Sequence, residues 1–298
     1  MQTPSSLHFV NVPGVGRIAY AQAGTGLPVL LLHGLGADHA IWRPTVAALS
    51  QRFTVYAPDL PGHGQSAHPK RAYTLDFGVA FAAALLDALR LEKAAVIGAS
   101  MGGMLATALA VRHPQRVQAL VLADPAGLGR ELARPMRLAT VPVIGPLLAF
   151  LDMRFGPGLI PSLVHRPERL EPGMAQEIYR MAAAPGVRSA ALNVLHQGVS
   201  PGGMKPALVQ LEGFSGLTCP VLVLWGAEDK IIPVAHAELA RKALPAAQVH
   251  VFLECGHLPF LEEAEASNRL VSAFLRDALA AEGAAAIPAS TNEGRSPA

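Results

Sequence analysis

Short apolar segments alternate with helical patterns along most of this chain, and this alternation restricts the possible folds more than any other feature. Four segments are mostly apolar and short enough to be strands buried on both faces: PVLLLHG (28–34), AAVIG (94–98), VQALVLADP (117–125) and PVLVLWG (220–226). Helical patterns lie near residues 40–50 and 74–90, between the first two segments, and near residues 234–243, after the fourth. Parallel strands need crossover connections of this kind. The sequence therefore predicts an α/β fold with a mostly parallel, doubly wound sheet.

Eight strands are expected in total, and the other four are LHFVNV (7–12), RIAYAQAG (17–24), FTVYAPD (53–59) and QVHVFLE (248–254). From residue 129 to 214, Pro and Gly interrupt short apolar helices and no convincing strand is present. This part is predicted to be a helical cap inserted after the sixth strand. Residues 1–128 and 215–281 would form the core domain, with helices on both faces of its sheet. Residues 282–298 are small and polar and predict a disordered tail.

Composition argues against two classes of partner. The chain has 298 residues, a formal charge of +2 and only 15% charged residues, with no long basic run for nucleic acid. Charge, Gly or Pro interrupts each apolar run before the roughly 18 residues that a membrane span requires. The first residues, MQTPSSLHFVNVPG, lack the pattern of a secretory signal. A soluble, cytoplasmic protein is expected, and its oligomeric state is left open.

The two cysteines are expected to be free thiols. Cys219 opens one predicted strand and Cys255 follows the next, so the two lie at opposite ends of neighbouring parallel strands. Strands of this length hold them well beyond the roughly 7 Å limit for a disulfide. The histidines show no spacing typical of a zinc site. Neither a metal nor another cofactor is therefore expected.

A serine stands at a tight strand-to-helix turn in the sequence GASMGG (98–103). In a structural interpretation, the glycines only permit a close turn and Ser100 caps the following helix. In a catalytic interpretation, the turn is a strained elbow that exposes the Ser100 hydroxyl as a nucleophile. The motif alone is weak evidence, because a chain rich in Gly, Ala and Ser produces such strings by chance.

Two further side chains stand where catalytic partners of Ser100 are expected. Asp229 and His257 each follow a predicted strand, and functional groups of parallel sheets gather at the carboxyl ends of strands. A serine nucleophile needs a base and a carboxylate that orients the base, and Ser, Asp, His is the chain order for this topology. Taken singly, His257 could be a structural residue, and Asp229 or Glu228 could cap the next helix. Their joint occurrence favours catalysis.

With these residues in place, the chain resembles the α/β-hydrolase superfamily over about residues 7–128 and 215–280. The resemblance rests on HGLG (33–36), DLPGHGQS (59–66), GASMGG (98–103), WGAEDKIIP (225–233) and CGHLPFLE (255–262). It implies an α/β-hydrolase fold, Ser100 as nucleophile, His257 as base and Asp229 as the orienting acid. Asp124, after the sixth strand, is the second choice for the acid because some relatives place theirs there.

The resemblance also suggests donors for an oxyanion hole. The backbone N–H of Met101, at the start of a helix, suits a developing negative charge. The second donor is expected after the third strand, at Leu35, with Gly36 as the alternative. His33 resembles the structural histidine that braces this loop in the family. The segment DLPGHGQS is expected to be a scaffold turn.

Ester hydrolysis through an acyl-serine is the function that we expect. A serine nucleophile argues against haloalkane dehalogenases and epoxide hydrolases, whose elbow carries an aspartate. Carbon–carbon hydrolases of ring-cleavage products usually carry Trp directly after the catalytic His, where this chain has Leu258. An acyltransferase or a carbon–carbon hydrolase on the same fold remains an alternative, and a noncatalytic ligand receptor is less favoured because it would need no intact triad.

The expected substrate is a neutral small-molecule ester with a short to medium acyl chain. The segment LATVPVIGPLLAFL (138–151) in the predicted cap carries no charge that could bind a carboxylate or phosphate. Its apolar side chains either pack over the sheet or line an acyl pocket. The predicted substrate-binding residues are Leu147, Leu148, Phe150 and Leu258.

Overall fold

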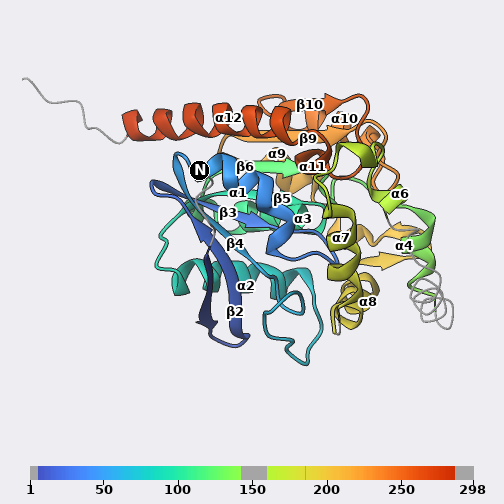
Figure 1. Ribbon diagram of the computed structural model, residues 1–298. Helices are drawn as coiled ribbons and strands as arrows, with labels where there is room; N and C mark the ends of the chain where they lie inside the picture. The colour runs from blue at the N-terminus through green and yellow to red at the C-terminus, as the bar shows by residue number, and fades with distance from the viewer. Residues whose placement is uncertain (1–5, 142–159, 185, 286–298) are drawn as a thin grey trace, which may run out of the picture.

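The computed structural model describes residues 6–141, 160–184 and 186–285. Its main element is an eight-stranded sheet with the strand order β1-β2-β4-β3-β5-β6-β9-β10 (Figure 1). The strands β1 and β2 are antiparallel to each other, β2 is antiparallel to β4, and all further pairs are parallel. This confirms the mostly parallel eight-stranded sheet. The strands are β1 (Ser6–Val12), β2 (Gly16–Ala23), β3 (Leu27–Leu32), β4 (Phe53–Pro58), β5 (Ala94–Ala99), β6 (Val117–Ala123), β9 (Val221–Gly226) and β10 (Gln248–Phe252).

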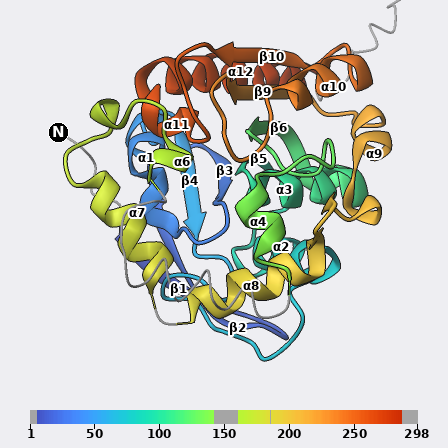
Figure 2. The same cartoon turned by 90° about the vertical axis from the view of Figure 1, so that its right-hand side faces the viewer.

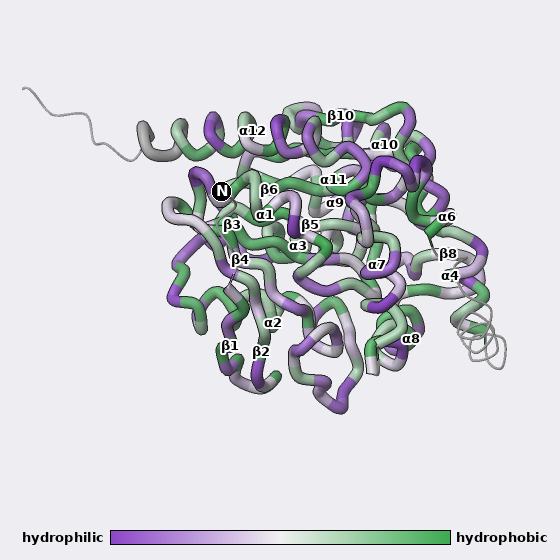
Figure 3. Tube along the Cα trace, in the orientation of Figure 1, coloured by the Kyte–Doolittle hydropathy of each residue, from purple (hydrophilic) through white to green (hydrophobic). Residues whose placement is uncertain are grey.

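Helices cover both faces of the sheet because alternate side chains of each central strand point to opposite faces. Val29 and Leu31 of β3 pack with α1 (Arg43–Leu49), α11 (Pro259–Glu262) and α12 (Ala264–Ala285). Leu30 and Leu32 pack with α2 (Leu75–Ala88), α3 (Met101–Arg112) and α10 (Ala235–Ala243) on the other face. Figure 3 shows the central strands hydrophobic along their length, whereas α12 alternates between hydrophilic and hydrophobic positions. The continuous apolar segments of the sequence are thus strands buried on both faces.

The chain between β6 and β9 supplies a group of short helices at one end of the sheet. Among them α4, α6, α7 and α8 lie at the right of Figure 1 and face the viewer in Figure 2. The helices are α4 (Arg134–Leu138), α6 (Ile160–Leu163), α7 (Met174–Ala183), α8 (Val187–Gly198) and α9 (Leu211–Ser215). Single 3-10 turns occur here and elsewhere at η1 (His39–Trp42), η2 (Pro114–Arg116), η3 (Pro167–Arg169) and η4 (Pro206–Leu208). The assignment of 129–214 as a cap domain stays a prediction.

Two details differ from the sequence expectations. A small antiparallel pair, β7 (Val199–Ser200) and β8 (Gly203–Met204), lies in the segment where no strand was expected. Two residues a strand are too few to produce an alternating pattern, so the sequence carried no signal for it. Helix α12 also continues to Ala285, past the predicted start of the tail at residue 282. Within the described ranges, no helix is both long and apolar enough to cross a membrane.

Both cysteines are free, as expected. Strand β10 pairs in parallel with β9, which places Cys219 before one strand and Cys255 after its neighbour. Burial raises the pKa of the Cys219 thiol to about 11, and burial together with nearby carboxyl groups raises the pKa of Cys255 as well. A thiol that keeps its proton is a poor nucleophile. The raised pKa values therefore disfavour both cysteines as nucleophiles.

Candidate active site

The backbone at Ser100 is a strained turn between β5 and α3. Ser100 has φ 53° and ψ −117°, a conformation that residues other than glycine rarely adopt. Three hydrogen bonds hold it there: its N–H donates to Ala123 O (3.0 Å), and its carbonyl accepts from the N–H groups of Met104 and Ala126 (both 3.1 Å). Hydrogen bonds to β6, to the segment directly after it and to the first turn of α3 thus keep Ser100 in this strained conformation. This backbone is the elbow that the sequence predicted.

Two glycines of the motif are required by the close approach of α3 to the sheet. A Cβ atom at Gly98 would lie 2.3 Å from the carbonyl oxygen of Gly102. A Cβ atom at Gly102 would lie 2.1 Å from the carbonyl oxygen of Leu32, at the end of β3. Both contacts are with backbone, which cannot move aside without shifting the helix. The glycines therefore permit the helix to start directly against β3 and β5, with Ser100 at the junction.

The Ser100 hydroxyl does not cap α3. Ser100 occupies the N-cap position, but its side chain makes no capping hydrogen bond with the described helix. Gly34 faces it from the loop after β3, where a Cβ atom would lie 3.2 Å from Ser100 Cβ and 3.8 Å from Oγ. The hydroxyl is thus left available at a partly buried position, which favours the catalytic interpretation over the structural one.

His257 and Asp229 form a buried hydrogen-bonded pair. His257 Nδ1 lies 2.7 Å from Asp229 Oδ2, and the two side chains are 4% and 0% exposed. The other oxygen, Oδ1, accepts from the backbone N–H groups of Ile231 (2.7 Å) and Ile232 (3.0 Å). Asp229 therefore stabilises the start of the following turn and also holds the imidazole by Nδ1. The second-choice acid, Asp124, makes no hydrogen bond to the histidine ring, since Nδ1 is paired with Asp229.

A buried carboxylate that the sequence analysis did not single out holds the loop of His257. Glu262, in α11, is 4% exposed. Its Oε1 accepts from the N–H of Gly256 and its Oε2 from the N–H of Arg166, both at 2.6 Å. The N–H of His257 itself donates to Leu163 O (2.8 Å). His257 and its loop are therefore fixed to residues of the chain between β6 and β9. A charge within the otherwise apolar PFLE was the only signal in the sequence.

Ser100 and His257 line one cavity of about 200 Å³, here called the serine cavity. The predicted residues Leu35 and Leu258 line it as well. Leu147, Leu148 and Phe150 lie outside the described residues, so the structure says nothing of their contacts. Four of the predicted site residues that the structure describes therefore line this cavity: Ser100, His257, Leu35 and Leu258. Asp229 lies behind His257 and does not line the cavity. Met101 lies beside it, directly after Ser100.

Two N–H groups remain as candidates for the oxyanion hole. In the part of the chain that the structure describes, neither Leu35 nor Met101 has a hydrogen-bond acceptor for its backbone N–H. The N–H of Gly36, the alternative, donates to His63 Nε2 at 3.2 Å. This engagement disfavours Gly36 and favours Leu35. Met101 is the first residue of α3, where the N–H groups of a helix have no partner within the helix.

Two neutral histidines brace the loop that carries Leu35. His33 accepts from the N–H of Leu60 at Nε2 (2.9 Å) and lies 2.8 Å from Gly34 O at Nδ1. His63 accepts from Gly36 and donates from Nδ1 to Pro61 O (3.1 Å). Burial, aided by the neighbouring His33, lowers the pKa of His63 to about 3. DLPGHGQS was expected to be a scaffold turn, and the sequence carried no signal for this direct bond from His63 to the loop after β3.

Because His63 is buried with a lowered pKa, we expect the free energy of unfolding to depend on pH. The unfolded chain binds a proton on this residue near the ordinary histidine pKa of about 6.5, whereas the folded protein does so only near pH 3. Acidification from about pH 6.5 towards 3 should therefore lower the free energy of unfolding by up to about 1.4 kcal/mol per pH unit. Urea unfolding over this range should give a shallower dependence in His63→Gln. Parallel curves for the two proteins would contradict a neutral His63.

Carboxylates and histidines gather at two places that could be considered for a metal ion. Within the described residues, the two groups are Asp38, His39 and Asp59, and Asp124, Asp229 and His257. Asp59 already accepts from the N–H groups of His39 and Gln65. A cation at the second group would have to replace the His257–Asp229 hydrogen bond. Asp59, Asp229 and His257 are thus already engaged in hydrogen bonds, and the absence of a metal stays a prediction.

The chain is similar to known proteins over most of its length. The chain matches the family described as alpha/beta hydrolase fold over residues 28–264. It is 36% identical to the dihydrolipoyllysine-residue acetyltransferase component of the acetoin cleaving system of Cupriavidus necator, over 91% of this chain and 69% of that protein. It is 31% identical to 2-hydroxymuconate semialdehyde hydrolase of Pseudomonas sp. strain CF600, over 91% and 97%. A thermophilic esterase from Thermogutta terrifontis superimposes with a TM-score of 0.74 at 27% identity, over 92% and 99%.

Proposed function

The chain belongs to the alpha/beta hydrolase family, and from this premise we propose that it is a serine hydrolase that cleaves uncharged carboxylic esters. One observation carries the proposal. Ser100 has a strained backbone and a hydroxyl that does not cap α3, and it lines the same cavity as His257. The Nδ1 atom of His257 is held by the buried side chain of Asp229. These three residues are the nucleophile, base and orienting acid that acyl transfer requires.

In the proposed reaction, Ser100 Oγ attacks the ester carbonyl while His257 accepts its proton. The Asp229 carboxylate keeps the other ring proton on Nδ1, so that Nε2 is free to act as the base. The N–H groups of Leu35 and Met101 stabilise the oxyanion. The C–O bond then breaks, His257 returns the proton to the departing alcohol, and water releases the acid from the acyl-serine in the reverse sense.

The lining of the site favours an uncharged substrate. The serine cavity adjoins a second cavity of about 60 Å³, here called the middle cavity, and the two share Leu35, Ser100, Met136 and Leu195. Among the described residues, no Lys, Arg, Asp or Glu lines either cavity. A carboxylate on the substrate would thus be buried without a cation, which is costly. This argues for neutral esters and, together with Leu258 after the base, against acidic ring-cleavage products.

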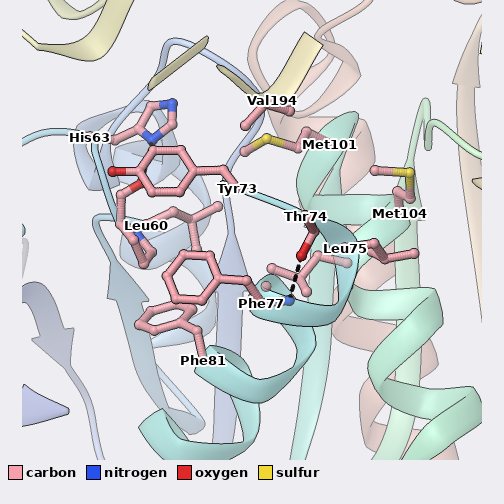
Figure 4. Close-up of a pocket in the computed structure, with 13 residues that line it drawn as sticks. Leu60, His63, Tyr73, Thr74, Leu75, Phe77, Phe81, Met101, Met104 and Val194 are labelled. Atoms are coloured by element: carbon pink, nitrogen blue, oxygen red, sulfur yellow. Dashed lines mark hydrogen bonds between the residues drawn. The ribbon is translucent and has the colours of Figure 1, made fainter. Parts of the chain in front are cut away.

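A third cavity extends the site towards α2. It has about 70 Å³ and shares with the middle cavity the residues Tyr73, Leu75, Met101, Met104 and Val194. Figure 4 shows the rings of Tyr73, Phe77 and Phe81 along this third cavity, with Met101 and Val194 at its upper end. We propose that the acyl chain passes Met101 into this space. The predicted contribution of Leu147, Leu148 and Phe150 to an acyl pocket remains a separate proposal.

This proposal predicts how activity depends on chain length. Each CH₂ group that enters the apolar space should contribute up to about 0.8 kcal/mol, close to fourfold in kcat/KM, until the space is full. Val194→Trp should shorten the chain at which kcat/KM is greatest while preserving the hydrolysis of the acetate ester. The measurement is a series of p-nitrophenyl esters from acetate to palmitate. His196→Trp, at an exposed position of the same helix, is the matched control. An optimum at acetate in every protein would contradict the proposed chain path.

Acyl transfer is the second candidate, favoured by the resemblance to an acetyltransferase component. It would use the same nucleophile, base and oxyanion hole, and would differ only in the acceptor of the acyl group. Partition of the acyl-enzyme between water and an added alcohol separates the two functions. We expect the free acid to be the main product at low alcohol concentration. Transfer to a dilute alcohol in preference to water would favour the transferase.

A further inference from the structure

Asp124 is a fully buried carboxyl group that the proposed reaction does not use. It follows β6 with φ 44°, in the left-handed region, and is 0% exposed. Its N–H donates to Leu224 O (3.0 Å), and its Oδ1 accepts from the N–H of Gly226 (3.0 Å). Gly226 ends β9, directly before the turn that carries Asp229. Asp124 therefore joins the end of β6 to the strand that positions the acid.

The second oxygen of Asp124 points to an additional interaction. Oδ2 is buried, and no donor among the described residues reaches it. One carboxyl oxygen of Asp124, one of Asp229 and one ring nitrogen of His257 all lie within 4.8 Å of one another. Two carboxylates that are buried this close cannot both be ionised without a counter-charge, because each raises the energy of the other. A proton on one of the two would remove this repulsion.

The donors around the two groups decide which one holds it. Asp229 accepts from two backbone N–H groups and from His257 Nδ1, whereas Asp124 accepts from one backbone N–H. Hydrogen bonds of this kind stabilise the ionised form, so the group with fewer donors, Asp124, is the better place for the proton. Burial and the charge of Asp229 raise the pKa of Asp124 well above its ordinary value. Of the other titratable groups near it, Glu262 and Cys255 bring no positive charge, and His257 directs its Nδ1 to Asp229.

We propose that Asp124 is a neutral carboxylic acid at neutral pH whose O–H donates a hydrogen bond to the Asp229 carboxylate. It is a positioning residue, because it acts on His257 only through Asp229. With this proton on Asp124, the two carboxyl groups behind His257 carry one negative charge in total. The otherwise unpartnered Oδ2 of Asp124 then acts as a hydrogen-bond donor. The effect on turnover rests on the proposed function, whereas the proton on Asp124 does not.

Infrared spectroscopy of the whole protein at neutral pH tests the proton directly. The wild-type spectrum should contain a protonated-carboxyl C=O band that Asp124→Asn removes. Asparagine tolerates the left-handed backbone and replaces the O–H by an N–H donor, so the variant is expected to fold. Identical spectra in this region would overturn the proposal, and would be expected if Asp124 were ionised and balanced by a cation. This readout holds whether or not the protein hydrolyses esters.

Kinetics test the positioning role. Asp124→Asn should keep kcat/KM within about threefold of wild type, with the acidic side of its pH profile unchanged, because it keeps a neutral donor. Asp124→Ala removes the donor and should lower kcat/KM about tenfold or more. If Asp124 were ionised, Asp124→Asn would instead remove a negative charge near His257 and shift the acidic side to lower pH, which would contradict the proposal. If wild type shows no ester hydrolysis, the proposed function fails while the infrared result still stands.

Discussion

Replacement of Ser100 by Ala should lower ester turnover by at least ~10⁴-fold, because only substrate binding and oxyanion stabilisation would remain. The fold should be unaffected. The hydroxyl makes no cap to α3, and alanine keeps the Cβ atom that packs near Gly34. The free energy of unfolding should therefore change by less than about 1 kcal/mol. The measurements are kcat/KM with p-nitrophenyl butyrate and urea unfolding of both proteins.

A fluorophosphonate probe provides the chemical check on this result. Wild type should form a covalent adduct on Ser100, and Ser100→Ala should form none. Ser215→Ala, which changes an exposed serine outside the serine cavity, is the control and should react like wild type. An adduct that persists in Ser100→Ala, or a variant that retains most of its activity, would assign the nucleophile to another residue. Failure of wild type to react would favour a noncatalytic receptor.

Asp229→Asn should have the second largest effect, a loss of roughly 10⁴-fold in kcat/KM. The backbone N–H groups of Ile231 and Ile232 would retain the amide oxygen at the position of Oδ1. The amide NH₂ would then face His257 Nδ1, which lies 2.7 Å from Oδ2 in the native protein. A donor at that place forces the ring to accept at Nδ1 and to carry its proton on Nε2. The imidazole is then in the tautomer that cannot accept the proton of Ser100.

Two matched variants make this prediction specific. Glu228→Gln changes an exposed neighbour of Asp229 and should preserve activity. Asp124→Asn changes the adjacent buried carboxyl group and should also preserve activity, because asparagine keeps a neutral donor at that position. If Asp229→Asn were active and Asp124→Asn inactive, the acid would be Asp124, the second choice of the sequence analysis. The pair of variants thus decides between the two carboxyl groups in one assay.

The sequence predicted the sheet and the elbow well because both are coded locally. A strand buried on both faces needs a continuous apolar segment, and β3, β5, β6 and β9 show this directly. The elbow needs small residues where α3 meets the sheet, and Gly98 and Gly102 stand at those positions. Each signal lies within a few residues of the feature that it predicts. The order of nucleophile, acid and base along the chain also follows from the order of the strands.

The tertiary structure alone decided how these groups are paired. Strand β6 lies beside β9, so Asp124 bonds to Gly226 and comes within reach of Asp229, although about a hundred residues separate them in the chain. In the same way, the bond from Gly36 to His63 favours Leu35 as the oxyanion donor, and the carboxylate of Glu262 fixes Gly256 beside the base. Hydrogen-bond partners are selected by distance and direction in the folded protein. The sequence therefore indicated which residues could react, and the packing of strand ends decided which of them come together.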